Sequence, residues 1–136
     1  MEHPDPDRLR DVPLFAGVSD EDLGRIAAWM EVEEFSEGKT LAREGQWGYV
    51  FWMIDEGRVR IEHDGATVAT LGPGEVLGEL AILGDGRRKA AAIADTDVRI
   101  FSMFGTHFRE MQAAVPVVDE RLQHESVDRL LELEGR

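Results

Sequence analysis

Apolar residues recur with helical spacing near the start of the chain, in the stretch SDEDLGRIAAWM. The apolar positions of this stretch are Leu23, Ile26, Ala27 and Met30, which fall on one face of a helix. Ser19 precedes them and can cap the helix, with Asp22 three residues later in a capping-box-like arrangement. The first residues, MEHPDPDRLRD, are polar and broken by prolines. We therefore expect residues 1–12 to form a flexible tail and residues 13–136 to form a single domain.

From about residue 32 to residue 102 the pattern changes to short apolar runs separated by turns such as SEGK, DEGR, HDGA and GDGR. The predicted strands cover residues 32–35, 40–42, 49–54, 58–62, 67–71, 90–94 and 98–102. Regularly spaced short strands of this kind predict an antiparallel sandwich or barrel. The run YVFWMI is unbroken and apolar, so we place it deep in the barrel wall. Trp29, Trp47 and Trp52 are expected to pack in the core or between the helix and the barrel.

Helical spacing returns after residue 102. One helix is predicted over residues 105–115, ending before Pro116, and a second over residues 117–136. The second carries a broken apolar stripe, interrupted at Ser126, whose members are Val118, Leu122, Leu130 and Leu133. The expected fold is mainly β with flanking α: an antiparallel β-roll or jelly-roll barrel over about residues 32–102, an N-terminal helix, and two C-terminal helices over about residues 105–134.

Charge and composition exclude several classes of function. The chain has 15 Lys and Arg against 28 Asp and Glu, a net charge of -13, so we expect no DNA binding, since nucleic acids are bound through clustered cations. There is no cysteine, and His3, His63, His107 and His124 are scattered without metal-ligand spacing, so we expect no metal site. Nor does the order of Ser, His and Asp suggest a catalytic triad, and we do not expect an enzyme. With no signal peptide and no apolar run long enough for a membrane span, we expect a cytoplasmic protein without membrane contact.

The stretch GPGEVLGELAILGDGRRKAAAI gathers positive charge in this acidic chain. Gly78 permits a backbone conformation that a side chain would block, and residues 79–82 can then make a single helical turn. The free N–H groups at the start of such a turn attract anions. Arg88 follows nine residues after Glu79, and a loop of that length can fold back to bring the guanidinium opposite the turn. An arginine donates two parallel bonds to a phosphate, and an ionised Glu79 accepts bonds from sugar hydroxyls.

This stretch resembles the phosphate-binding cassette of the cyclic-nucleotide-binding domain family. In that family the cassette reads roughly Phe-Gly-Glu-Leu-Ala, a short loop, and Pro-Arg-(Ala/Ser/Thr)-Ala. Residues 77–81 here read Leu-Gly-Glu-Leu-Ala, and Arg88 falls at a Glu-to-Arg spacing found in the family. The segments PLFAGVSDEDL, REG, EGRVRI, LGPGE and DTDVRIF also resemble family elements in the same order. The resemblance extends from about residue 13 to residue 133 and implies a double-stranded β-helix that acts as a sensor or regulatory domain.

The resemblance also implies a set of ligand-binding residues: Gly78, Glu79, Leu80, Ala81, Arg88, Lys89 and Ala90. Glu79 would accept a bond from the ribose 2′-hydroxyl, and Arg88 would hold the cyclic phosphate with backbone N–H groups near Ala81 and Lys89. The sequence departs from the family at Arg87, where proline is usual, and at Lys89, where a small residue is usual. A Thr that often accompanies cyclic GMP preference is absent there and at Ala91, so we expect cyclic AMP more than cyclic GMP as the ligand, with no further cofactor.

Several alternatives remain open at this point. Lys89 either adds a second cation to the phosphate site or crowds the ligand. Glu79 and Arg88 can instead form an internal ion pair in a fold that binds no nucleotide and serves as a protein interaction module. The C-terminal helices are then the surface for a partner protein or a homodimer. For the residue that covers the base, the candidates on the last helix are Arg121, His124 and Asp128.

Overall fold

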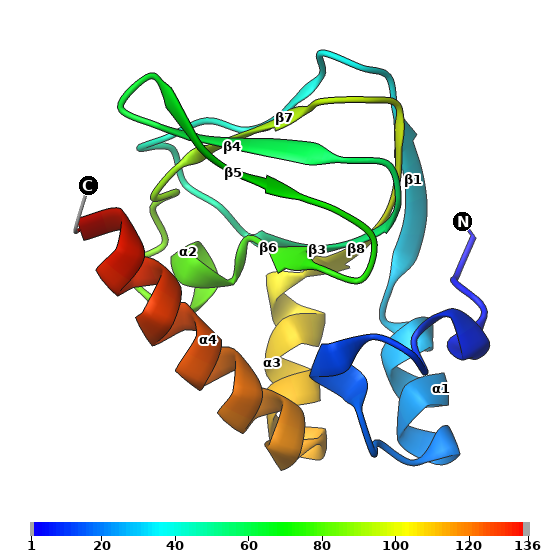
Figure 1. Ribbon diagram of the computed structural model, residues 1–136. Helices are drawn as coiled ribbons and strands as arrows, with labels where there is room; N and C mark the ends of the chain where they lie inside the picture. Colours follow the sequence, from blue (N-terminus) through cyan, green and yellow to red (C-terminus); the bar gives the residue numbers. More distant parts are fainter. Residues whose placement is uncertain (1, 135–136) are drawn as a thin grey trace.

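The computed structural model describes the backbone of residues 2–134, and the side chains of these residues except 126–128 and 130–134. Two antiparallel sheets of four strands face each other, and helices cover one side of them (Figure 1). The strands are β1 (Glu31–Phe35), β2 (Thr40–Ala42), β3 (Val50–Glu56), β4 (Val59–His63), β5 (Ala66–Leu71), β6 (Val76–Leu77), β7 (Ala91–Ala94) and β8 (Val98–Phe104). The helices are α1 (Asp20–Ala28), α2 (Glu79–Leu83), α3 (Gly105–Ala114) and α4 (Pro116–Glu134). The predicted β-roll with flanking helices is confirmed.

The strand order explains why the segment YVFWMI is apolar without interruption. One sheet has the order β1-β8-β3-β6 and the other has the order β2-β7-β4-β5. In β3, Trp52 and Ile54 face the interior between the two sheets, whereas Phe51 and Met53 face the helices. Since successive side chains of a strand point to opposite faces, a strand that is covered on both faces needs apolar residues at every position.

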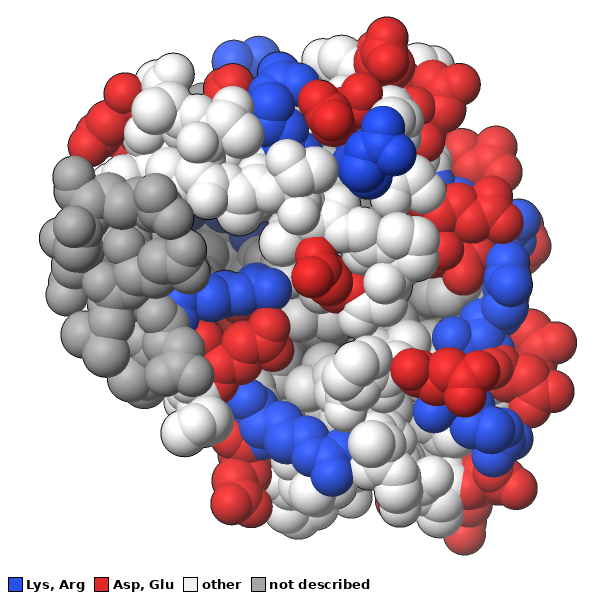
Figure 2. Space-filling model, viewed as in Figure 1, with Lys and Arg blue, Asp and Glu red and all other residues white. Residues whose placement is uncertain are grey.

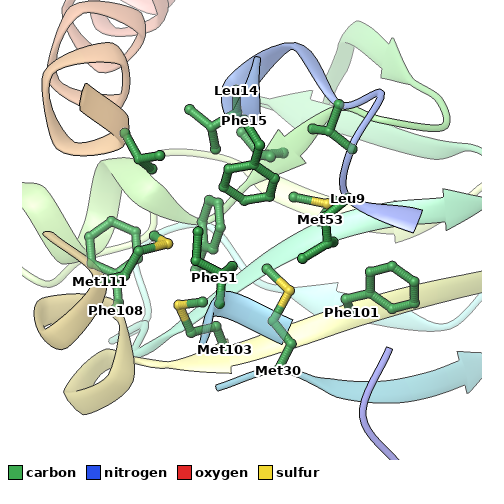
Figure 3. Packing of buried hydrophobic residues seen from close by; sticks show 14 of the residues in the cluster. Leu9, Leu14, Phe15, Met30, Phe51, Met53, Phe101, Met103, Phe108 and Met111 are labelled. Carbon is green, nitrogen blue, oxygen red and sulfur yellow. The ribbon is translucent and has the colours of Figure 1, made fainter. Parts of the chain in front are cut away.

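The larger of the two clusters of buried residues lies between the first sheet and the helices (Figure 3). Phe51 of β3 packs edge-to-face against Phe108 of α3, with ring centroids 5.2 Å apart. Met103 and Met111 lie around this pair (Figure 3). From α4, Leu122 reaches the same cluster, so the C-terminal helices are anchored to the barrel through one continuous core.

The N-terminal segment corrects one expectation. Residues 1–12 were expected to form a flexible tail, but Leu9 and Val12 are buried in the core, and a short 3₁₀ turn over Pro6–Arg8 precedes them. Arg8 also forms an ion pair with Asp55 on β3, with a nitrogen–oxygen distance of 3.2 Å. The burial of Leu9 and Val12 could not be predicted from the sequence, because two isolated apolar residues among charged ones show no helical or strand periodicity.

The bounds of the helices and strands lie close to those predicted from the sequence. The helix cap at Ser19 is confirmed, because its Oγ accepts a bond from the Asp22 N–H at 3.2 Å. The predicted strands lie within about two residues of the observed ones, whereas the two-residue strand β6 was not predicted. The last helix begins at Pro116 rather than after it, which suits proline because its missing N–H has no helical partner in the first turn. None of the helices in the described part of the chain has the length and apolar character needed to cross a bilayer.

The three tryptophans differ in how far their side chains are buried. Trp52 is buried and Trp29 packs against the core, as expected. The expectation for Trp47 is wrong, since this side chain is 56% exposed. Leu130, Leu133 and Ser126, which define the end of the predicted apolar stripe, lie outside the described side chains.

The division between a buried and an exposed face predicts different costs for the same substitution. Phe51→Ala removes a ring from the core and should lower the free energy of unfolding by about 3–5 kcal/mol. Phe104→Ala, at a half-exposed position, is the matched control and should cost about 0.5 kcal/mol or less. Urea unfolding followed by circular dichroism measures both. Equal losses in the two variants would contradict this assignment of the core.

Candidate ligand-binding site

A cavity of about 170 Å³ opens between the second sheet, helix α2 and the end of α4. Figure 2 shows a hollow beside α4 in which Lys or Arg atoms are visible. All seven residues predicted to bind the ligand line the cavity: Gly78, Glu79, Leu80, Ala81, Arg88, Lys89 and Ala90. We call residues 78–90 the cassette. The structure therefore brings the whole predicted set together.

Gly78 turns the chain from β6 into α2, the helical turn expected after it. Its φ angle is +96°, a conformation that side-chain-bearing residues rarely adopt. A Cβ atom there would lie 2.5 Å from the Val50 carbonyl oxygen and 3.0 Å from Nη1 of Arg88. The glycine is thus required both by the turn and by the close approach of Arg88.

Arg88 is held rigidly at the wall of the cavity. Its side chain donates to the carbonyl oxygens of Gly78 at 3.3 Å and Val50 at 3.1 Å, and its Cζ atom lies 4.7 Å from the ring centroid of Trp52. A Cβ on Gly48 would lie 2.0 Å from Nε of Arg88, so only glycine leaves room for the guanidinium. Burial lowers the pKa of Arg88, while the charge of Glu79 acts in the opposite direction. Arginine nevertheless remains charged, because its ordinary pKa is so high.

Glu79 is fully buried at the start of α2. Its Oε1 accepts a bond from Nη1 of Arg129 on α4 at 2.6 Å, while its Oε2 is buried and has no hydrogen-bond partner among the residues that the structure describes. Burial raises the pKa of Glu79 above its ordinary value, and the positive charge of Arg129 opposes that rise. The ion pair of Glu79 is therefore made with Arg129, and not with Arg88 as one sequence alternative had it.

Lys89 and Arg87, the two unusual neighbours of Arg88, have separate environments. Lys89 lines the cavity, but its Nζ binds Asp85 at 2.8 Å, and this bond lowers the pKa of Asp85. Arg87 is exposed and stacks on Trp47, with its Cζ atom 3.9 Å from the ring centroid. The positive charge of Lys89 is thus already balanced within the cassette.

The far end of the cavity is apolar, lined by Ile61, Val68, Ala69 and Leu71 from β4 and β5. Two of the residues proposed from sequence to cover a base, Arg121 and His124, do not line this cavity. Arg121 instead donates to the carbonyl oxygens of Leu14 and Ala16, at 3.0 and 2.8 Å, and His124 is not among the lining residues. The side chain of Asp128 lies outside the described residues. Among the α4 side chains that the structure describes, Arg129 lines the cavity.

Sequence reasoning missed Gly48, Trp52 and Arg129 as parts of this site. Gly48 resembled an ordinary turn glycine, and Trp52 belonged to an apolar run without polar markers. Arg129 lies fifty residues after its partner, so local spacing gives no indication of the contact. His63 also comes close to the cassette, since its Nδ1 lies 3.1 Å from the Lys89 carbonyl oxygen.

Comparison with known proteins agrees with this geometry. Residues 32–114 match the family model described as the cyclic nucleotide-binding domain. The chain is 29% identical to the cyclic AMP receptor protein of Thermus thermophilus, covering 84% of this chain and 55% of the relative. It is also 29% identical to a cAMP-dependent protein kinase regulatory subunit of Colletotrichum orbiculare, covering 89% of this chain and 32% of the relative.

A solved structure supports the same assignment. The crystal structure of the Thermus thermophilus catabolite activator protein superposes with a TM-score of 0.79 at 29% identity, covering 90% of this chain and 60% of that one.

The chain spans about half or less of the length of the two curated relatives. Because the family match extends over more than half of the chain and includes the cassette, the chain belongs to the cyclic nucleotide-binding domain family.

Proposed function

We propose that the chain binds a cyclic nucleotide in this cavity, with cyclic AMP preferred over cyclic GMP, and acts as a sensor that relays occupancy through its C-terminal helices. The observation that carries the proposal is that two buried polar side chains, Glu79 and Arg88, line the same cavity. The Oε2 of Glu79, which has no hydrogen-bond partner within the described part of the chain, is an acceptor for a ribose hydroxyl, and the guanidinium of Arg88 is a donor for a phosphate. Two of the curated relatives are named for cyclic AMP, which supports the same ligand class.

The chemistry of Arg88 suits a cyclic phosphate. A guanidinium carries five N–H donors, and the two bonds to Gly78 and Val50 leave others for an anion. Since the side chain is already fixed by these bonds and by Trp52, little further rotamer entropy is lost on binding. A ligand of about 22 non-hydrogen atoms at roughly 0.3 kcal/mol per atom gives about 6–7 kcal/mol, a Kd on the order of 10 μM.

Selectivity is proposed to favour adenine over guanine because neither Lys89 nor Ala91 offers the hydroxyl that the family resemblance links to cyclic GMP. The apolar end of the cavity suits the face of either purine. Lys89 is held by Asp85, so we expect it to border the phosphate site and not to fill it.

The relay is proposed to run through Arg129. This residue joins the ligand-facing carboxylate of Glu79 to α4, where it also pairs with Glu125 at 3.0 Å. A ribose hydroxyl bound to Glu79 changes the charge density that Arg129 contacts, and therefore biases the position of α4. Ligand and helix are then coupled as parts of one two-state element.

A second candidate function is a ligand-free interaction module. It is favoured by one observation, namely that Glu79 already has a protein partner in Arg129. In that case Arg88→Ala leaves function unchanged, while polar substitutions at Leu130 or Leu133 abolish assembly. The sensor predicts the reverse pattern.

Isothermal titration with cyclic AMP and with cyclic GMP tests the sensor directly. We expect saturable heat with both nucleotides and tighter binding of cyclic AMP. Protein shown to be free of bound nucleotide is needed, since a retained ligand would mask binding. No heat with either nucleotide at millimolar concentration contradicts the proposal.

Arg88→Ala should weaken cyclic nucleotide binding roughly ten- to a hundredfold, because a charge-assisted bond is worth about 1.5–3 kcal/mol. Arg88→Lys, which keeps the charge but loses the planar fork, should also bind more weakly. Arg87→Ala is the matched control, since Arg87 is exposed and stacks on Trp47 away from the cavity. Thermal unfolding verifies that each variant is folded. Unchanged affinity in folded Arg88→Ala and Arg88→Lys would remove Arg88 from the site.

The raised pKa of Glu79 predicts a pH dependence of nucleotide affinity. A hydroxyl donates more strongly to a carboxylate than to a carboxylic acid, so affinity should rise with pH through the Glu79 pKa and level off above it. Arg129→Ala removes a charge that lowers this pKa, so the rise should move to higher pH. Glu79→Gln should bind more weakly and show no such rise. Titrations across weakly acidic and neutral pH measure this, and an identical profile in Glu79→Gln would assign the dependence to another group.

A further inference from the structure

Three aromatic side chains stand exposed together on the surface beside the cassette. Trp47 is 56% exposed, Tyr49 is 64% exposed and Phe104 is 47% exposed. All three line two adjoining hollows of the surface, one bordered by β2 and the other by α2 and α3. We call these three residues the aromatic ridge. Contiguous exposed aromatics are unusual on a small domain and mark surfaces that another molecule covers.

Three arginines border the ridge: Arg43, Arg87 and Arg109. All are exposed, and none forms an ion pair with a carboxylate among the residues that the structure describes. Most arginines elsewhere in the described part of the chain have carboxylate partners: Arg8, Arg10, Arg25, Arg58, Arg60, Arg99 and Arg129. Arg88 and Arg121 instead donate to backbone carbonyl oxygens. Asp85 also lines the hollow bordered by α2 and α3, but its charge is offset by Lys89 at 2.8 Å. In a chain with 28 acidic residues, three arginines without a carboxylate partner around one apolar surface therefore make that surface complementary to an acidic partner.

The ridge is also fixed in place before any partner arrives. The Gly48 N–H donates to the Gly86 carbonyl oxygen at 2.8 Å, and the Arg88 N–H donates to the Gln46 carbonyl oxygen at 2.7 Å. Arg87 stacks on the Trp47 ring at 3.9 Å. These contacts hold the segment between β2 and β3 against the cassette, so little ordering entropy is lost when the ridge is covered.

We propose that the aromatic ridge and its three arginines form a docking surface for an acidic segment of a partner protein, one that carries apolar or aromatic side chains between its carboxylates. The apolar side chains of the segment cover Trp47, Tyr49 and Phe104, and its carboxylates pair with the arginines. Trp, Tyr and Arg are the residues that dominate binding energy at protein interfaces. The proposal stands whether or not the cavity takes a nucleotide, because none of its six residues is among those predicted to bind the ligand.

Selection of displayed random linear peptides on the full chain tests the proposal. We expect the enriched peptides to combine Asp or Glu with Leu, Phe or Trp. Their binding, measured by fluorescence anisotropy, should weaken about tenfold or more in Tyr49→Ser and in Arg87→Glu/Arg109→Glu. Replacing the carboxylates of a selected peptide by lysine should abolish binding to the wild-type chain and restore it to the Arg87→Glu/Arg109→Glu variant.

Two matched controls lie away from the ridge. Val117→Ser removes another exposed apolar side chain, and Lys39→Glu reverses an exposed cation, so both should bind the peptides as the wild type does. Enrichment of basic peptides, or peptides that bind all variants equally, overturns the proposal. Sedimentation measures whether the chain forms a dimer through the ridge. A dimer that Tyr49→Ser dissociates, with no acidic peptide selected, overturns it in favour of a second copy of this chain.

Discussion

The structure depends on one constraint: a guanidinium must be held at the edge of the barrel while most of its surface is withdrawn from water. Arg88 is 8% exposed. Burying a charge is costly unless it is hydrogen-bonded, and two carbonyl oxygens and an indole ring supply that compensation. The local chain geometry follows from this need. Gly48 leaves the space that the side chain occupies, and Gly78 turns the chain so that its carbonyl oxygen faces the guanidinium.

The second buried charge, Glu79, has a different consequence. A fully buried carboxylate is stabilised only if a partner compensates for lost hydration, and that partner comes from α4. The barrel and the last helix are therefore connected by the ion pair between Glu79 and Arg129, in addition to the apolar core that joins them elsewhere. Because none of the described side chains or backbone groups bonds to Oε2, the compensation is incomplete, and a hydroxyl donor in the cavity would complete it.

How much of this the sequence predicted depends on whether the signal was local. The helix cap at Ser19, most of the strands and the cassette from Gly78 to Ala90 are written in short segments whose spacing has a physical meaning. Arg129 could not be found in this way, since its contact with Glu79 joins distant parts of the chain. The expectations for Leu9 and Trp47 were wrong in opposite directions. Leu9, an isolated apolar residue, is buried, and Trp47, a large aromatic residue, is exposed. Burial at single positions is decided by tertiary packing, which hydrophobicity alone does not specify.

The hydrogen bonds of Arg121 fix the first part of α4 to another segment of the chain. Near its start the helix is fastened to the N-terminal segment, because Arg121 binds the carbonyl oxygens of Leu14 and Ala16 while Val118 and Leu122 are fully buried. Arg129 lies eight residues further, about 12 Å along the axis, and joins the helix to Glu79. The helix is thus fixed at two separate places, by the N-terminal segment through Arg121 and by the carboxylate of Glu79 through Arg129. The contacts at these two places share no residue, so loss of the second leaves the first intact.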